Sequence, residues 1–167
     1  MANFATPLLN ATVTTTYRSA GVISVNTTTS NQRRIQIYEI EFGQSGALAS
    51  TDIQNQWDVS RFTVTNLVVG TAVIANPLDN ADVVALTQYL NNVNTEVSAM
   101  AVAGSGLSLK NWGINQRGSY RWRALDDGDN IMIPATAGFG IAIRELTGSA
   151  SAIGSQTAVG TVSFIER

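Results

Sequence analysis

The 167-residue chain contains no histidine and no cysteine, and Lys110 is its only lysine. A chain without cysteine cannot form a disulfide framework, a thiolate zinc site, an iron–sulfur cluster or a cysteine nucleophile. A chain without histidine also lacks the commonest general base and the commonest transition-metal ligand, which excludes a cupin site and a Ser-His-Asp triad. We therefore expect a binding module that is not an enzyme and that needs no cofactor and no metal.

Strong net charge and long apolar runs are also missing. The formal net charge is −2, whereas a protein that neutralises nucleic-acid phosphates directly needs clustered Lys and Arg. No segment approaches the ~20 apolar residues of a transmembrane helix, and residues 1–10 lack the basic and apolar regions of a signal peptide. We expect no direct nucleic-acid partner, no membrane partner and synthesis without Sec export.

The ten basic residues are arginine apart from Lys110. Arginine makes planar, bidentate contacts and is enriched at protein interfaces, where lysine is depleted. The bias favours a role in protein–protein contacts, although a compositional bias of the source genome would give the same pattern.

The composition of the chain favours short strands and turns. Thr, Asn, Ala, Val, Gly and Ser dominate, a mixture that favours strands over helices. Apolar alternation predicts strands at about residues 12–18, 22–27, 34–42, 57–65, 68–74, 96–102, 119–125, 131–133, 140–146 and 159–165. The fold class is therefore all-β, and the strand number suits a jelly-roll β-sandwich with one or two strands left over.

The strands at 34–42 and 57–65 are joined by a connection too long for a hairpin, which is typical of a Greek-key or jelly-roll sheet. In both, the apolar positions change parity halfway: Ile35 and Ile37 give way to Tyr38, Ile40 and Phe42, and Trp57 and Val59 give way to Phe62 and Val64. A bulge in each strand, or burial on both faces, would account for the change.

One segment has a helical pattern. Pro77 ends the preceding strand, Asp79 is a suitable N-cap, and Val83, Leu86 and Leu90 can share one face. The pattern predicts one short α-helix over residues 79–90, which would cover an open end of the sandwich.

The N-terminal segment carries Phe4, Leu8 and Leu9 before any convincing strand. These side chains need burial, so they either dock on their own domain or reach a neighbouring subunit. We favour the second and predict an N-terminal arm over residues 1–16, followed by a single jelly-roll domain over residues 17–167.

The clearest period-2 strand, at 119–125, has Tyr120 and Trp122 on one face and Arg121 and Arg123 on the other. Aromatics and arginines could form a stacking platform for single-stranded nucleic acid, but here they alternate. We expect the aromatics in the core and an exposed arginine row that meets acidic side chains of a neighbouring strand or subunit.

Trp112 lies in a loop-like context that suits an interface anchor. With it, the candidate interface residues are Phe4, Leu8, Leu9, Trp112, Arg117, Arg121 and Arg123.

Two sets of acidic residues can each be interpreted as a functional site or as a structural feature. Asp126, Asp127 and Asp129 around a glycine resemble part of a calcium loop, but the EF-hand spacing is absent and a plain turn uses the same residues. Glu39 and Glu41 alternate as a glycosidase pair would, but such pairs are more often solvated or bridged to an arginine of the next strand, here Arg61 or Arg121. We expect neither a metal site nor a catalytic site.

Five segments occur in order between Arg33 and Arg144: R-I-Q-I-Y-E-I-E-F-G, W-D-V-S-R-F-T, N-P-L-D-N-A-D, N-Q-R-G-S-Y-R-W-R and D-N-I-M-I-P-A-T-A-G-F-G-I-A-I-R. Together they resemble the jelly-roll head decoration (cement) proteins of tailed bacteriophages, including those of cyanophages. The resemblance implies a structural virion protein, made in the host cytoplasm, that binds the outside of the major capsid protein lattice and stabilises the expanded head. It also implies a homo-oligomer, with a homotrimer expected.

Two alternatives remain at this point. A carbohydrate-binding β-sandwich that serves host recognition should show exposed aromatic side chains and often calcium. A viral jelly-roll coat protein should show a basic interior arm.

Overall fold

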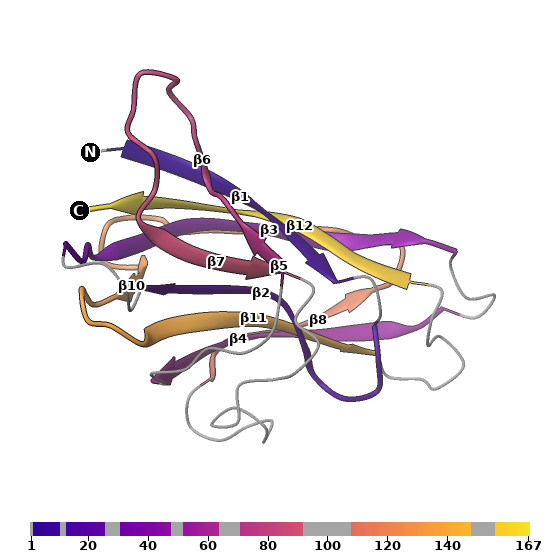
Figure 1. Ribbon diagram of the computed structural model, residues 1–167. Helices are drawn as coiled ribbons and strands as arrows, with labels where there is room; N and C mark the ends of the chain where they lie inside the picture. The colour runs from indigo at the N-terminus through magenta and orange to yellow at the C-terminus, as the bar shows by residue number, and fades with distance from the viewer. Residues whose placement is uncertain are drawn as a thin grey trace.

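The computed structural model describes residues 2–10, 13–25, 31–47, 52–63, 71–91, 108–147 and 156–167. Its strands form two antiparallel six-stranded sheets that lie face to face (Figure 1). The described ranges contain no helix, and therefore none long and apolar enough to cross a membrane. The all-β class and the sandwich predicted from the sequence are confirmed.

Sheet A contains, in order, β10 (Ile131–Ile133), β3 (Ile35–Gly46), β12 (Gln156–Glu166), β1 (Ala2–Asn10) and β6 (Asn76–Pro77), and β9 (Tyr120–Arg123) also pairs with β3. Sheet B contains, in order, β5 (Thr71–Val73), β7 (Thr87–Asn91), β2 (Arg18–Val25), β11 (Phe139–Thr147), β4 (Gln54–Thr63) and β8 (Ser108–Asn115). Successive strands alternate between the sheets from β1 to β4. The strands β5, β6 and β7 extend both sheets beyond β1 and β2.

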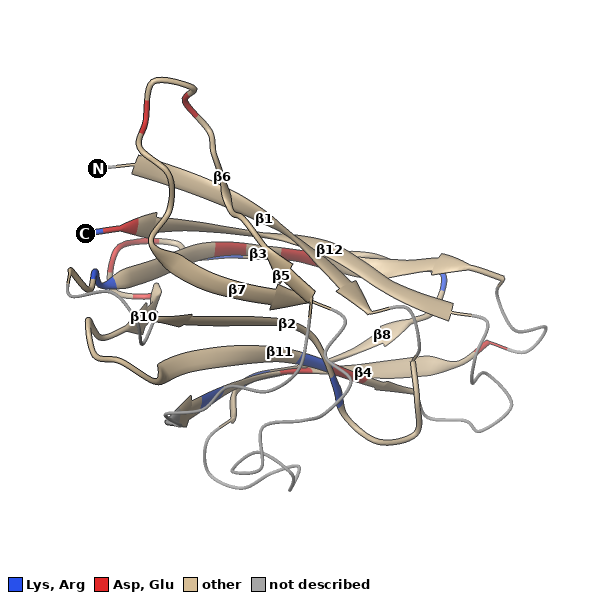
Figure 2. Ribbon diagram, viewed as in Figure 1, with Lys and Arg blue, Asp and Glu red and all other residues tan. Residues whose placement is uncertain are grey.

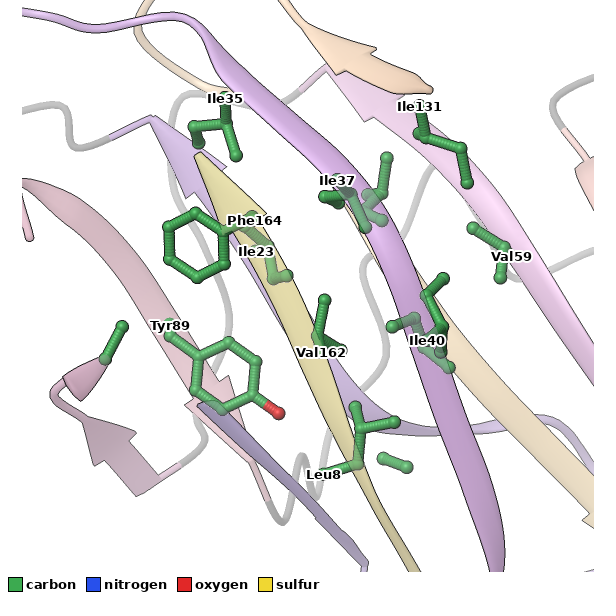
Figure 3. Close-up of a cluster of buried hydrophobic side chains, with 14 of the residues drawn as sticks. Leu8, Ile23, Ile35, Ile37, Ile40, Val59, Tyr89, Ile131, Val162 and Phe164 are labelled. Atoms are coloured by element: carbon green, nitrogen blue, oxygen red, sulfur yellow. The ribbon is translucent and has the colours of Figure 1, made fainter. Parts of the chain in front are cut away.

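The core lies between the sheets and is built from long aliphatic and aromatic side chains (Figure 3). Ile23 of β2, Ile40 of β3 and Phe164 of β12 have no exposed surface. Burial of each such side chain stabilises the fold by about 1.5–3 kcal/mol. Tyr89 of β7 joins this core, and its hydroxyl donates a hydrogen bond to the Pro7 carbonyl of β1, so that β7 is tied to the other sheet.

The change of parity in the strands predicted at 34–42 and 57–65 has a different cause in β3 and in β4. In β3, Glu39 pairs with Ser163 but Ile37 pairs with Phe164, so Tyr38 is the extra residue of a bulge. The bulge lets Ile37 and Ile40 both join the core. In β4 the register against β11 is unbroken, and Phe62 is buried outside the core cluster that holds Trp57. Burial on both faces therefore explains β4.

The predicted helix over residues 79–90 is wrong. Asp79 does accept a hydrogen bond from the Ala81 backbone N–H at 2.9 Å, but its own carbonyl accepts from Asp82 at 3.0 Å, so the capping signal closes a turn. Val83, which was expected on the buried face of that helix, is 60% exposed, and its neighbour Val84 is 65% exposed.

Tertiary hydrogen bonds also compete with that helix. The backbone N–H groups of Leu86 and Thr87 donate to the Glu166 carboxylate at 3.2 and 2.7 Å. The chain then pairs with β2 as strand β7. Long-range pairing thus overrides a local helical pattern that had little intrinsic strength.

The expected N-terminal arm is a strand of the sandwich. Residues 2–10 form β1, which pairs with β12 along its whole length and lies between β12 and β6. Phe4 and Leu8 are 0% and 2% exposed, and Phe4 stacks on Phe164 at 5.5 Å. The segment therefore docks on its own domain. Its alternation is hard to see in the sequence because Thr6 and Asn10 share the buried positions with Phe4 and Leu8.

The remaining strands agree with the predictions to different extents. The strand at 131–133 is confirmed residue for residue as β10. Residues 13–17, predicted as part of a strand, precede β2 and are not extended in a sheet. Strand β8 was not predicted, and the predicted strand at 96–102 lies outside the described residues.

Gly160→Ala should destabilise the protein by about 1–3 kcal/mol through steric strain. A Cβ atom at Gly160 would collide with the Glu41 carbonyl oxygen of β3 and approach the Phe42 Cα to 2.9 Å. Gly113→Ala in β8 is the matched control, because its Cβ would meet only Gln54 Oε1 at 3.8 Å. Urea denaturation measures the difference, and equal midpoints for both variants would contradict this account of the packing.

Candidate interaction surfaces

One side edge of the sandwich is formed by β8 of sheet B and β9 of sheet A, which are joined by a tight turn in which the Gly118 N–H donates to the Asn115 carbonyl at 2.8 Å. Aromatic rings lead from the core to this edge. Phe42 contacts the buried Trp57 at 4.5 Å and Trp112 at 5.3 Å, and Trp112 contacts Tyr120 at 5.5 Å. Tyr120 is 39% exposed. The edge is therefore aromatic at the surface as well as inside.

Basic side chains also lie on this edge. Lys110 Nζ lies 5.6 Å from the centre of the Trp122 ring, a cation–π geometry. Arg121 Nη2 and Arg123 Nε lie 2.7 and 3.9 Å from the same carboxylate oxygen of Glu39. The hydrogen bond from Arg121 to Glu39 raises the pKa of Arg121 further. We call Lys110, Trp112, Tyr120, Arg121, Trp122 and Arg123 the β8–β9 edge.

The expected bridge from the glutamates to a neighbouring strand is confirmed for Arg121. Arg61 instead donates to the Met132 carbonyl at 2.7 Å. Arg117 pairs with the exposed Asp52 at 2.8 Å. Trp122 packs against the core as expected, whereas Tyr120 lies further out than the alternation predicted.

An open hollow of about 400 Å³ adjoins this edge. Its lining is polar and apolar in about equal parts, and its polar side chains are Glu41, Gln44, Arg117, Ser119 and Thr161. Such a hollow can take a small polar ligand, but it holds no cluster of groups suited to nucleophilic or acid–base catalysis.

The opposite side edge carries an apolar loop. Residues 78–86 connect β6 to β7 and project beyond the sheets next to the N-terminus (Figure 1). Leu78, Val83 and Val84 on this loop are at least 60% exposed, and Asp79 and Asp82 give it negative charge (Figure 2). Neither aspartate forms an ion pair within the described part of the chain. We call residues 78–86 the β6–β7 loop.

A buried ion pair joins the strands in the middle of sheet B. Asp58 of β4 accepts hydrogen bonds from Arg144 of β11, at 3.0 Å from Nε and 2.5 Å from Nη2, and also from the Ser60 and Ser108 hydroxyls. The Arg144 guanidinium lies 4.9 Å from the centre of the Tyr17 ring. These contacts tie β4 to β11 and, through Ser108, to β8. The cluster acts as a structural link.

Asp58→Ala should destabilise the protein by about 3–5 kcal/mol, because it leaves the Arg144 charge buried without its partner. The control is Asp52→Ala, which breaks another Asp–Arg pair whose side chains are 66% and 51% exposed and which should change stability little. Thermal and chemical denaturation compare the two. A similar loss in both variants would show that the Asp58 pair contributes no more than a surface pair.

Polar side chains also occupy one end of the space between the sheets. Gln44 of β3 donates to the Glu145 carboxylate of β11, and Asn55 of β4 donates to Gln156 of β12 at 3.2 Å. Glu145 is 1% exposed, and its Oε2 has no hydrogen-bond partner in the described part of the chain. Burial raises the pKa of Glu145 to about 8, and the Gln44 hydrogen bond opposes the shift. The folded protein therefore holds a neutral glutamic acid at pH 7.

Glu145 should make the protein less stable as the pH rises. Its pKa is raised from 4.5 to about 8 by folding, so between these values the folded state binds a proton that the unfolded state releases. The resulting contribution is complete below pH 4.5 and is lost by about 1.4 kcal/mol per pH unit up to the folded pKa. The isosteric Glu145→Gln should remove this slope, and no histidine is present to mask it. Parallel pH profiles of unfolding free energy for wild type and variant would contradict the prediction.

The other acidic residues considered from the sequence have structural partners. Asp126 Oδ1 accepts from the Gly128 N–H at 2.7 Å, and Asp127 Oδ1 accepts from Gln36 at 3.2 Å, so these aspartates stabilise a turn. Among the residues that the structure describes, no three His, Cys, Asp or Glu side chains gather as they would around a metal ion.

The predicted interface residues therefore separate into two groups. Phe4 and Leu8 lie in the core and Leu9 is half-buried in β1, so these three do not form an arm. Trp112, Arg117, Arg121 and Arg123 come together on or beside the β8–β9 edge, and their role as an interface stays a prediction. Sequence reasoning missed the β6–β7 loop, because residues 79–90 were predicted as a helix with Val83 and Leu86 on its buried face.

Comparison with known proteins assigns no family. No protein-family model matches the chain, and no curated protein matches it. Its function must therefore be inferred from its fold, its surfaces and its sequence motifs.

Proposed function

We propose that the protein is a jelly-roll decoration protein of a tailed bacteriophage, which binds the exterior of the major capsid lattice as a homo-oligomer and stabilises the expanded head. The observation that carries the proposal is the order of the strands. If β5, β6 and β7 are counted as an insertion and β9 with β10 as one broken strand, sheet A has the order 1-8-3-6 and sheet B the order 2-7-4-5. This order agrees with that of an eight-stranded jelly roll and so supports the proposed fold.

The positions of four of the five motifs support the same proposal. R-I-Q-I-Y-E-I-E-F-G and W-D-V-S-R-F-T lie on β3 and β4, where they build the core. N-P-L-D-N-A-D begins the exposed β6–β7 loop, and N-Q-R-G-S-Y-R-W-R spans the turn and strand of the β8–β9 edge. The resemblance to decoration proteins thus includes two surfaces that are open to contact, and the trimer that it implies could use both.

The physical requirements of such a protein suit this chain. A protein that binds only the assembled lattice stabilises it by mass action, and an oligomer that engages several capsomers converts modest contacts into strong attachment. Neither effect needs a cofactor or a catalytic group. Surface arginines and aromatics are the residue types that contribute most to binding at protein interfaces.

A second candidate, carbohydrate binding, has one observation in its favour. Tyr120 is 39% exposed and directly follows Ser119 of the polar hollow. An aromatic ring beside polar groups is the usual arrangement for a sugar ring. Glycan binding by the purified protein, lost in Tyr120→Ala, would favour this candidate.

The proposed function predicts that the purified protein binds expanded phage heads that lack it. Decorated heads should release their DNA at a higher temperature than undecorated ones, because binding stabilises the assembled lattice. Co-sedimentation and cryo-electron microscopy would detect binding, and a DNA-binding dye would follow release during heating. Unexpanded heads are the control and should bind less. Identical release curves with and without the protein would count against the proposal.

A further inference from the structure

The β6–β7 loop and the β8–β9 edge lie on opposite sides of the sandwich. Strands β6 and β7 stand beyond β1 and β2, whereas β9 and β8 border β3 and β4 at the other end of the two sheets. A contact between them cannot form within one chain. It can form between two copies of the chain placed side by side.

The two surfaces are complementary in chemistry. The loop presents three exposed aliphatic side chains together with Asp79 and Asp82, neither of which has an ion-pair partner in the described residues. The edge presents Tyr120 with Lys110 and Arg123 nearby. Both surfaces are partly apolar, and their charges are opposite.

The cations of the edge are not saturated by their own chain. Arg121 and Arg123 share the single Glu39 carboxylate, and Arg123 reaches it only at 3.9 Å. The Arg123 side chain is 69% exposed, and a guanidinium carries five N–H donors. Glu41 offsets part of this charge from β3, whereas the Lys110 ammonium, which lies over the Trp122 ring, has no ion-pair partner among the described residues. The edge therefore keeps donors that can meet the loop carboxylates.

We propose that the β6–β7 loop of one copy docks on the β8–β9 edge of the next copy, so that the chains join head to tail. The inference deepens the proposed function by naming the subunit interface. The expectation that three chains close into a ring rests on that proposed function. A contact between two different patches of identical chains generates a closed ring when the rotation allows closure and a filament when it does not. Docking buries Leu78, Val83 and Val84 and pairs Asp79 and Asp82 with Lys110 and Arg123.

The test reverses the charges of each surface separately and then together. The loop variant is Asp79→Lys with Asp82→Lys, and the edge variant is Lys110→Glu with Arg123→Glu. Each should weaken self-association by on the order of 100-fold, because like charges then face each other across the contact. The combined four-residue variant should regain the wild-type oligomer. Analytical ultracentrifugation over a concentration series measures the association.

A matched control reverses two charges elsewhere. Asp126 accepts a backbone N–H of its own turn in the way that Asp79 does, so Asp126→Lys with Asp129→Lys makes the same kind of change. The two aspartates lie in the connection between β9 and β10, outside the residues that define either surface, so this control should associate like wild type. Circular dichroism and thermal unfolding of each variant check that the fold is retained.

A monomeric wild type, a loop variant that associates like the control, or a combined variant that stays monomeric would each overturn the interface. Binding to phage heads is measured in the same variants and separates this inference from the proposed function. A wild type that is monomeric yet binds heads, with binding lost in the loop variant, would assign the loop to the capsid protein. An oligomer with the expected charge dependence that binds no heads would keep the interface and reject the decoration role.

Discussion

The pairing of β12 with both β1 and β3 is the interaction on which the rest of the structure depends. The last strand of the chain lies between the first and the third, so sheet A is complete only when the whole chain is in place. Its close approach to β3 at Gly160 admits no side chain. At its end, Glu166 accepts two backbone N–H groups at the start of β7 and pairs with Arg33 at 3.2 Å. One strand thus links both sheets, and the long loop closures involved predict slow folding.

Buried polar groups add a second constraint. The Asp58–Arg144 pair and the Glu145 carboxyl are each buried, and each costs desolvation free energy that an apolar pair would not. The ion pair recovers that cost through several hydrogen bonds in sheet B. Glu145 recovers it by remaining protonated and by accepting from Gln44 across the two sheets. Both groups constrain which strands lie opposite each other, since a shift by one residue would leave them without partners.

How far the sequence predicts this structure depends on whether a local pattern decided the outcome. Strands β3, β4, β10, β11 and β12 could be predicted because their apolar residues follow the strand period, and the parity change in β3 pointed to the bulge at Tyr38. Strand β1 was missed because Thr6 and Asn10 occupy inward positions. The false helix had a genuine capping residue in Asp79, but Glu166, far away in the sequence, takes the backbone N–H groups of Leu86 and Thr87. Of the two surfaces, the β8–β9 edge could be predicted in part, because Arg121 and Arg123 alternate with aromatic residues in the sequence. The exposed β6–β7 loop could not be predicted.

The side edges of the sandwich show why contact between copies would use side chains and not added strands. An open β-edge invites pairing with another chain unless charge, proline or a bulge interrupts it. Strand β8 carries Lys110, and its register against β4 shifts between Val59 and Ser60, so its edge is interrupted near its start. On the other side β6 has only two residues and includes Pro77, and β5 has three. Since both edges resist strand addition, contact between copies is left to the exposed side chains of the β6–β7 loop and to the aromatic and basic side chains of the β8–β9 edge. A head-to-tail contact made by these side chains gives a defined assembly without the risk of uncontrolled sheet growth.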